Sequence, residues 1–386
     1  MFIPRTLQRT LHRLIRTYPV LAITGPRQSG KTTLLRKQFP EYKYVSLENP
    51  DIRERAEEDP NSFLKKYDRH VIFDEVQRTP HLFSYIQTKI DEDQTMGQFI
   101  LSGSQNFLLL QSIQQSLAGR VAMLKLLPFS MPELEAALLL SPDWESATIK
   151  GFYPPIFGRE MSPADFYPHY VETYLERDVR NLIQIKDLSP FRQFLKRCAG
   201  HAGQLLNLSE LARDCGISPP TAKAWLSVLE SSFILFTISP YFTNFNKRLI
   251  KRPKLYFYDT GLLCHLLGIT SEAELDTYYQ RGNIFENLII AELHKRRLHQ
   301  GQQPAFHFFQ DSNKNEIDIL SEKAGRLYIA EIKATRTPTA RHFKPLEKFR
   351  KTAPLPIAKA SLIYGGEEAF EHKGIHVLPW KSCKLF

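Results

Sequence analysis

The sequence is poor in cysteine and contains no long apolar run. Its 386 residues include four cysteines, none of them in a CxxC pair: Cys198, Cys215, Cys264 and Cys383. Such wide spacing argues against a zinc site and indicates free thiols in a reducing cytosol. Because 18 consecutive apolar residues occur nowhere, we expect no transmembrane helix. The Arg-rich amino terminus also lacks the apolar core of a secretory signal, so a cytoplasmic protein with no membrane partner is expected.

What the chain has in excess is positive charge. Lys and Arg number 51 against 41 Asp and Glu, which gives a formal net charge of +10. An excess of this size favours a polyanionic partner, nucleic acid before an acidic membrane surface. Charge carries no information about fold, so an ordinary globular protein that happens to be basic stays the alternative. The length indicates two or three domains.

Apolar runs alternate with helical patterns in the first third of the chain. This order predicts an α/β fold with a parallel sheet covered on both faces. The expected strands are Val20–Thr24, Tyr44–Leu47, Val71–Phe73, Phe99–Ser102 and Val121–Leu126. An amphipathic helix precedes them, and its basic face is expected to be solvated. That face consists of Arg5, Arg9, Arg13 and Arg16.

The rest of the chain mixes helical and strand patterns. We expect a loop at Ser141–Gly158, which is rich in Pro and Gly, and helices at Phe166–Ile185, within Leu205–Glu230 and at Ile284–Leu298. The expected strands are Ser232–Pro240, Leu249–Tyr258, Phe306–Phe309, Glu316–Leu320, Leu327–Lys333 and Ser361–Tyr364.

The segment from Gly25 to Thr32 matches the pattern G-x-x-x-x-G-K-[ST]. It lies between an expected strand and a helical stretch, where backbone N–H groups and a helix N-terminus can close around phosphates. Lys31 is expected to contact the β- and γ-phosphates of ATP, and Thr32 to ligate Mg²⁺. The expected nucleotide-binding residues are Gly25, Pro26, Arg27, Gln28, Ser29, Gly30, Lys31, Thr32, Thr33 and Asp74.

Three further positions complete the expected ATPase site. An apolar strand ends in Asp74 and Glu75, which are expected to hold Mg²⁺ and to polarise the attacking water. Ser104, after the next strand, is placed to sense the γ-phosphate, with Ser102 as the second candidate. Arg120 can stabilise transition-state charge, in its own subunit or from a neighbour, or it is an ordinary surface arginine.

These segments together resemble a known family. GPRQSGKTT, IFDEVQRTP, LSGSQ and LAGR followed by LPFSMPEL are similar to a prokaryotic AAA+-type ATPase family (AAA_14 type) with a C-terminal DUF4143 region. The resemblance covers nearly the whole chain. It implies a P-loop sheet with an added strand, the strand before Ser104, between the P-loop strand and the strand that ends at Asp74. AAA+-like enzymes often form rings, so a homo-oligomer is a further expectation.

The middle of the chain looks like a helix-turn-helix. Gly216 supplies the turn and Ser218 caps the second helix; the core stripe is Leu211, Ala212, Ile217, Trp225 and Leu229. The two following strands would form a wing, whose candidate contacts to DNA phosphates are Lys247, Arg248, Lys251, Arg252 and Lys254. Lys223 is the main charge on the second helix, which is little for base reading. A protein-interaction or lid module therefore stays the alternative.

The last third places acids and a lysine in an order that resembles the PD-(D/E)XK nuclease-like fold. Glu331 and Lys333 share one face of an expected strand, and Asp318 lies on the strand before it. Glu286, from the first helix, would complete a Mg²⁺ shell of Glu286, Asp318 and Glu331, and Lys333 would assist the attacking water. Ile317 stands where the motif has Pro. The alternative is a surface ion pair on an edge strand.

The expected division is an AAA+-type ATPase domain at 1–135, a helical connector at 136–190, a winged-helix domain at 191–260 and a restriction-endonuclease-like α/β domain at 261–386. Two functions fit it. One is an ATPase that binds ATP and Mg²⁺ and controls a DNA-binding, DNA-cleaving region. The other is an ATP-dependent switch or scaffold whose C-terminal domain binds a partner without cleaving anything.

Overall fold

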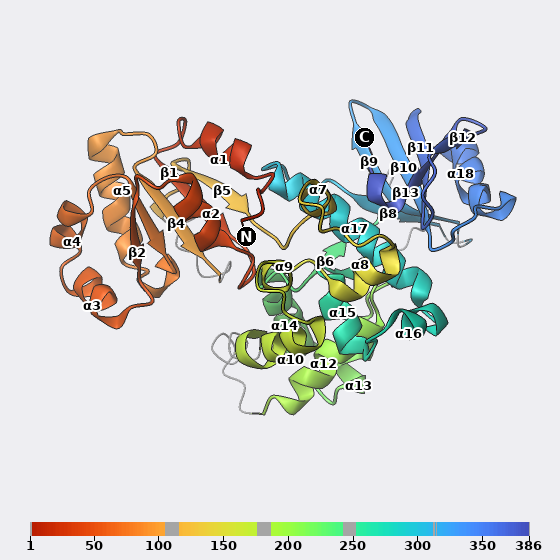
Figure 1. The fold of residues 1–386 in the computed structure, drawn as a ribbon, viewed down its shortest axis with the longest axis horizontal. Helices are drawn as coiled ribbons and strands as arrows, with labels where there is room; N and C mark the ends of the chain where they lie inside the picture. Colours follow the sequence, from red (N-terminus) through yellow and green to blue (C-terminus); the bar gives the residue numbers. More distant parts are fainter. Residues whose placement is uncertain are drawn as a thin grey trace.

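The structure is a computed structural model that describes residues 2–104, 116–175, 187–241, 252–311, 313 and 315–385. An N-terminal sheet and a C-terminal sheet lie on either side of a helical middle, and a long central helix runs between them (Figure 1). Among the described helices, none has both the length and the apolar character needed to cross a bilayer.

The N-terminal sheet has five parallel strands in the order β2-β3-β4-β1-β5. Strand β4 lies between β1 and β3, which confirms the expected added strand. The strands are β1 Val20–Thr24, β2 Lys43–Ser46, β3 Val71–Asp74, β4 Phe99–Gly103 and β5 Val121–Lys125. The surrounding helices are α1 Gln8–Leu14, α2 Lys31–Gln38, α3 Pro50–Glu58, α4 Pro60–Lys66 and α5 Leu82–Asp93.

Strand β1 is buried on both faces, as a parallel sheet covered by helices requires. Leu21 and Ile23 pack in a core with residues of α1 and α2, whereas Val20 and Ala22 pack in the core shared with α3, α4 and α5. The predicted solvated face of the first helix is wrong at one position. Arg5 is buried, while Arg9, Arg13 and Arg16 are exposed.

The helical middle contains α7 Met131–Ala136, α8 Trp144–Lys150, α9 Pro154–Gly158, α10 Pro163–Tyr170 with a π-helical turn at Val171–Leu175, α12 Ser189–Gly200, α13 Leu208–Asp214, α14 Pro219–Ser231, α15 Thr260–Leu267 and α16 Glu272–Thr277. The loop expected at Ser141–Gly158 is therefore wrong. Asp143 caps α8 through the Ser146 N–H, and Pro154 starts α9 at a position that needs no N–H donor. Proline here begins a helix instead of breaking one.

The helix pair α13 and α14 lies where the sequence predicts it. Gly216, at φ +64°, forms the turn, and the Ser218 hydroxyl accepts a hydrogen bond from the Thr221 N–H at the start of α14. The two helices contact each other, and Leu211 and Leu229 are fully buried. Two antiparallel strands follow, β6 Leu235–Ile238 and β7 Lys254–Phe257.

The C-terminal sheet has six strands in the order β12-β13-β11-β10-β9-β8. Its elements are α17 Arg281–His299, β8 His307–Gln310, β9 Glu316–Lys323, β10 Arg326–Lys333, α18 Ala340–Thr352, β11 Ile357–Tyr364, β12 Phe370–His372 and β13 Ile375–Pro379. Strand β10 is central. Ala330 and Ile332 pack in the core that contains α17, and Leu327 and Ile329 in the core that contains α18. An edge-strand ion pair at Glu331 is thereby excluded.

One hydrophobic core joins the middle of the chain to the C-terminal helix α17. It includes Trp144 of α8, Tyr167 of α10, Phe194 of α12 and Phe285 of α17. The expected boundaries at 190 and 260 therefore do not coincide with a break in the core. Residue Thr260 is the first residue of α15.

Candidate functional site

The P-loop wraps the end of β1 and leads into α2. Gly25 has φ +155°, and a Cβ there would lie 2.0 Å from the Leu126 carbonyl oxygen, so only glycine fits. Gly30, at φ +91°, is the N-cap of α2. The Lys31 ammonium donates to the carbonyl oxygens of Gly25 and Pro26, each at 2.8 Å. The predicted loop residues thus form one turn around the N-terminus of a helix, where N–H groups bind phosphate.

Asp74 is the carboxylate beside this loop, and its partners are hydroxyl groups. Its Oδ2 accepts hydrogen bonds from Thr32 Oγ1 at 2.8 Å and from Tyr44 Oη at 2.6 Å. Its Oδ1 accepts from Ser102 Oγ and from the Glu75 N–H. Burial, and then the hydrogen bond to Asp74, raises the pKa of Tyr44. Sequence reasoning missed Tyr44, because it lies on a different strand, 30 residues away in the chain.

Glu75 lies next to Asp74 in a left-handed conformation, at φ +55°. Its Oε2 accepts a hydrogen bond from the Gln77 side-chain amide and another, at 3.3 Å, from Ser104 Oγ. Each of the two serines therefore contacts a different acid: Ser102 donates to Asp74 and Ser104 donates to Glu75. Residue Gln105, part of the segment that carries the resemblance, lies outside the described residues.

Arg120 and the P-loop lie at opposite ends of two neighbouring strands, β5 and β1. Arg120 precedes β5, whose Val121 pairs with Val20 at the start of β1, whereas the P-loop follows the end of β1. A strand of five residues, about 16 Å, separates the two positions. The guanidinium instead donates to both carboxylate oxygens of Asp91, at 2.6 and 2.9 Å. The predicted role of Arg120 at the nucleotide of its own chain is wrong, and only a role at a neighbouring subunit stays a prediction.

A cavity of about 440 Å³ opens beside the P-loop. Gln28, Gly30 and Thr33 line one side of it. The other walls come mainly from the amino-terminal segment and from α9 with the residue after it, and they include Phe2, Ile3, Arg5, Phe129, Pro154, Pro155 and Arg159. These walls could not be predicted, since their residues lie far from the loop in the chain.

The predicted C-terminal site residues come together at β9 and β10. Lys333 Nζ lies 2.7 Å from Glu331 Oε1 and 3.2 Å from Asp318 Oδ2. Asp318 also accepts a hydrogen bond from the Ile332 N–H at 2.7 Å. The second oxygen of Glu331, Oε2, is buried and has no hydrogen-bond partner among the residues that the structure describes. The expectation that these three side chains share one face is confirmed.

Glu286 joins this group through a lysine that the sequence assigned elsewhere. Lys254 is buried, and its Nζ lies 3.1 Å from Glu286 Oε1 and 2.5 Å from Glu316 Oε1. Tyr256 donates a second hydrogen bond to Glu286 at 2.6 Å. The prediction that Lys254 contacts DNA phosphates is therefore wrong, because its ammonium points into the acids. We name the side chains of Glu286, Glu316, Asp318, Glu331, Lys254 and Lys333 the acid–lysine cluster.

Burial and mutual repulsion weaken the acids of this cluster. Burial first, and then the charge of Asp318, raise the pKa of Glu331 to about 8. Burial likewise raises the pKa of Glu286 to about 7, although Lys254 opposes the shift. Within the described part of the chain, no three His, Cys, Asp or Glu side chains converge closely enough to hold a metal ion. The acids are held apart on two lysines, so the expected Mg²⁺ shell is not preformed.

The expected wing is described only in part. Lys247, Arg248 and Lys251 lie outside the described residues, whereas Arg252 is exposed. Lys223, on α14, is exposed as well.

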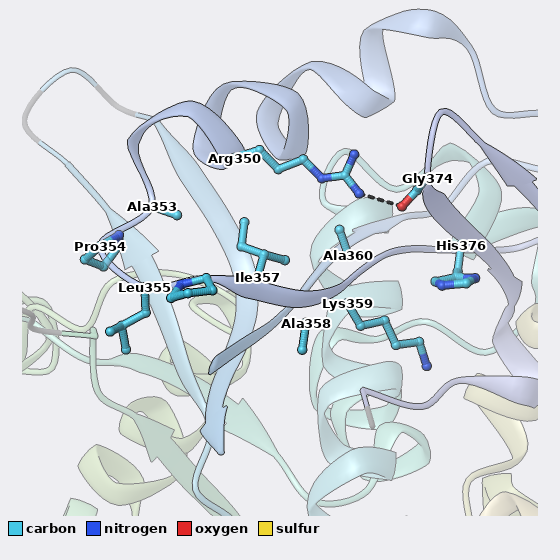
Figure 2. A pocket seen from close by; sticks show the side chains of 11 residues that line it. Arg350, Ala353, Pro354, Leu355, Ile357, Ala358, Lys359, Ala360, Gly374 and His376 are labelled. Atoms are coloured by element: carbon cyan, nitrogen blue, oxygen red, sulfur yellow. Dashed lines mark hydrogen bonds between the residues drawn. The ribbon is translucent and has the colours of Figure 1, made fainter. Parts of the chain in front are cut away.

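A separate cavity of about 580 Å³ lies at the start of β11, between Arg350 of α18 and the turn at Gly374 (Figure 2). Arg350 and Gly374 both line it, and Arg350 donates a hydrogen bond to the Gly374 carbonyl oxygen. None of the predicted site residues line this cavity.

Three family models match the chain. They are described as AAA domain, residues 17–135, Domain of unknown function (DUF8612), residues 141–273, and Domain of unknown function (DUF4143), residues 281–383. Two uncharacterized proteins, from Mycobacterium bovis and Mycobacterium tuberculosis, are each 30% identical over 371 residues, 94% of this chain and 79% of theirs. A Walker-type ATPase of Pyrococcus abyssi, 17% identical, covers 67% of this chain and 94% of its own, with a TM-score of 0.42.

Proposed function

The chain belongs to the family of AAA-type ATPases that carry a C-terminal DUF4143 domain, and from this we propose that it hydrolyses ATP with Mg²⁺ at the P-loop. The observation that carries the proposal is the 2.8 Å contact between Thr32 and Asp74. A hydroxyl and a carboxylate at one point form the oxygen donor set that Mg²⁺ prefers, with phosphates supplying the rest. The ion would neutralise charge on the phosphates that Lys31 also contacts.

Each remaining residue has a role that its place supports. Lys31 leaves the carbonyl oxygens of Gly25 and Pro26 to contact the phosphates, since phosphate is the stronger acceptor for an ammonium. Glu75 orients and polarises the attacking water. Gln77 and Ser104 hold its carboxylate in place. The cavity of about 440 Å³ beside the loop receives the nucleoside.

The test is phosphate release in Mg²⁺ and ATP by wild type and by Lys31→Ala, Glu75→Gln and Lys37→Ala. Lys37 is an exposed lysine on the same helix, α2, and is the matched control. We expect Lys31→Ala and Glu75→Gln to lose about 100-fold or more in rate, while Glu75→Gln still binds ATP and Lys37→Ala resembles wild type. Full turnover by Lys31→Ala would overturn the proposal.

We also propose that the C-terminal region acts on DNA, with the acid–lysine cluster as a metal-dependent phosphodiester-cleaving site. Four carboxylates against two lysines leave a formal charge of −2, and Glu331 Oε2 is buried with no hydrogen-bond partner in the described part of the chain. A divalent cation would balance that charge. Glu286, Asp318 and Glu331 would hold it, and Lys333 would orient the water. A winged-helix arrangement of α13, α14, β6 and β7, with Arg252 exposed beside it, would contact DNA phosphates.

The competing function is a switch or scaffold, and Lys254 is the observation that favours it. Its ammonium already neutralises Glu286 and Glu316, so the cluster can serve as a buried structural ion-pair network. In that case the C-terminal domain binds a partner and the ATP site reports or drives the binding.

Cleavage of plasmid DNA in Mg²⁺ or Mn²⁺, with and without ATP, separates these two functions. Glu331→Gln is the site variant, and Glu371→Gln, an exposed acid of β12, is the control. The nuclease proposal expects nicking that Glu331→Gln loses and Glu371→Gln retains. No cleavage by wild type, or cleavage unchanged in Glu331→Gln, favours the scaffold. DNA affinity that falls steeply with salt would support phosphate contacts independently of cleavage.

A further inference from the structure

Arg5 is a buried arginine that contacts the P-loop from outside it. It lies three residues before α1 and is only 5% exposed. Its Nη1 donates to the Ser29 carbonyl oxygen at 2.9 Å, and its Nη2 donates to the Leu127 carbonyl oxygen at 2.5 Å. The guanidinium also lies 4.6 Å above the centre of the Phe129 ring. A side chain that is far from the phosphate-binding motif along the chain therefore forms a hydrogen bond with one of the peptide groups of that motif.

The peptide group that Arg5 holds is the one that connects Ser29 to Gly30. A peptide unit is planar, and in its trans form the C=O and N–H point in opposite directions. The described chain contains no cis peptide bond. Fixing the Ser29 carbonyl toward Arg5 therefore fixes the direction of the Gly30 N–H, which lies on the opposite side of the loop. This N–H is one of the groups that a P-loop turns toward phosphate.

Glu133, on α7, holds Arg5 in this position. Its Oε2 lies 3.2 Å from Arg5 Nε, and the two side chains are each 3% exposed. Glu133 also accepts hydrogen bonds from the N–H groups of Thr6 and Ser130, at 2.7 and 2.9 Å. Although burial opposes its ionised form, the charge of Arg5, followed by His299, holds the pKa of Glu133 well below its usual value. The ion pair is therefore complete at neutral pH.

The third member of the network comes from the other end of the chain. His299, the last residue of α17, accepts a hydrogen bond from the Leu127 N–H through Nε2, at 3.2 Å. This leaves the ring proton on Nδ1, which lies 3.4 Å from Glu133 Oε1. Two more residues of α17 bind the same segment, since Glu292 accepts from the Met131 N–H and Lys295 donates to the Phe129 carbonyl oxygen. Figure 1 shows α17 reaching the side of the N-terminal sheet.

We propose that Arg5 is a positioning residue of the ATP site, held by Glu133 and His299, so that helix α17 of the C-terminal region completes the nucleotide-binding loop. The role is positional because Glu133 already balances the charge of Arg5. Helix α17 has 19 residues and is about 28 Å long. Its far end carries Glu286, which belongs to the acid–lysine cluster. Buried polar contacts therefore link the orientation of the Ser29–Gly30 peptide group to the position of helix α17.

The inference rests on the proposed ATP site, and the test uses the full chain. Dissociation constants for a non-hydrolysable ATP analogue, and KM and kcat for ATP, are measured for Arg5→Ala, Arg5→Lys, Glu133→Gln and His299→Ala. The control is Arg9→Ala, an exposed arginine on the first turn of α1. We expect Arg5→Ala to raise Kd and KM about tenfold and to leave kcat within about threefold, because it removes binding common to ground and transition states.

Arg5→Lys should recover part of the affinity, since an ammonium still reaches one carbonyl oxygen. Glu133→Gln and His299→Ala should weaken binding in that order, although neither touches the nucleotide, and Arg9→Ala should have no effect. Linkage also requires that the analogue slow hydrogen exchange in α17 from Glu292 to His299 in wild type. Circular dichroism identifies any variant that fails to fold, and the exchange measurement on wild type does not depend on a variant.

Two results would overturn the inference. One is a folded Arg5→Ala or Glu133→Gln protein with wild-type Kd and KM. The other is unchanged exchange in α17 upon saturation with the analogue. A wild type that binds no ATP analogue would instead remove the proposed function itself, so the two failures are distinguishable.

Discussion

Two of the acidic sites in the described part of the chain are stabilised by different means. Asp74, beside the P-loop, receives hydrogen bonds from three hydroxyl groups, those of Thr32, Tyr44 and Ser102. The acid–lysine cluster receives two ammonium groups, those of Lys254 and Lys333. A hydroxyl stabilises a carboxylate without cancelling its charge, whereas an ammonium does both. Asp74 thus keeps a charge that an external cation would balance, as proposed for Mg²⁺, whereas two of the four charges of the C-terminal cluster are already balanced by its lysines.

The largest expected effect tests the first half of this comparison. Asp74→Asn keeps the shape and loses the charge that would hold Mg²⁺, so ATP hydrolysis should fall about 100- to 1000-fold. Glu331→Gln removes a charge from the other cluster and should leave ATP turnover within about twofold, because that cluster does not touch the nucleotide. Phosphate release measured across a Mg²⁺ titration decides this. Similar losses in both variants would mean that the clusters are not independent.

The second prediction removes the internal cation. Lys254→Met leaves the largely buried Glu286 and the half-buried Glu316 without their ammonium partner, and we expect a loss of about 3–5 kcal/mol in the free energy of unfolding. Lys373→Met is the matched control, since its contact to Glu347 is long at 3.8 Å and exposed, and such pairs contribute about 0–1 kcal/mol. Urea unfolding followed by circular dichroism compares the two. Equal stability of Lys254→Met and wild type would show that the cluster takes up protons or metal in place of the lysine.

The ATP site was largely predictable because its chemistry is local in the chain. Gly25 to Gly30 form the turn between β1 and α2, and Lys31 and Thr32 begin α2. Asp74 ends a strand of obvious apolar character, and Glu75 follows it. Parallel strands bring their carboxyl ends to one edge, so the sequence alone placed these residues together. What it could not show is Tyr44 and Arg5, whose partners are far away in sequence.

Lys254 shows why a run of like charges is a poor guide to orientation. The pattern from Lys247 to Lys254 reads as one basic surface, and Arg252 is exposed as expected. Side chains of a strand point alternately to opposite faces, however, and which face is buried depends on what packs there. Here all four residues of β7 are buried, and α17 brings Glu286 to Lys254, a contact between residues 32 apart in the chain.

The third prediction concerns pH in the absence of divalent metal. Burial and the charge of Asp318 raise the pKa of Glu331 from 4.5 to about 8. Between these values the folded protein keeps a proton that the unfolded chain has released, so the free energy of unfolding should decrease as pH rises and level off above about 8. The slope is at most about 1.4 kcal/mol per pH unit for each such proton. Thermal melting in EDTA from pH 5.5 to 8.5 measures it.

Glu331→Gln is the matched variant for this measurement, because glutamine keeps the size of the side chain and cannot titrate. Its stability should depend less on pH than that of wild type over the same interval. The pH dependence left in the variant comes from Glu286, whose pKa is raised to about 7, and, with the opposite sign up to about pH 6.5, from His265, His294 and His342, whose pKa values burial lowers. A wild type whose stability increases with pH above about 7, where these histidines no longer titrate, would contradict the raised pKa values and with them the second half of the comparison.

The smallest expected effect belongs to Arg120. Its ion pair with Asp91 is exposed and lies at the amino-terminal end of the strands, whereas the P-loop lies at their carboxyl end. Arg120→Ala should therefore leave the melting temperature unchanged. At a protein concentration low enough to keep the chains apart, ATP turnover should stay within about twofold of wild type, since the side chain cannot reach its own nucleotide. Turnover per chain is therefore measured against protein concentration. A rate that rises with concentration in wild type and stays flat in Arg120→Ala would place Arg120 at a neighbour's ATP, because only assembly can bring that end of one sheet to the P-loop of another.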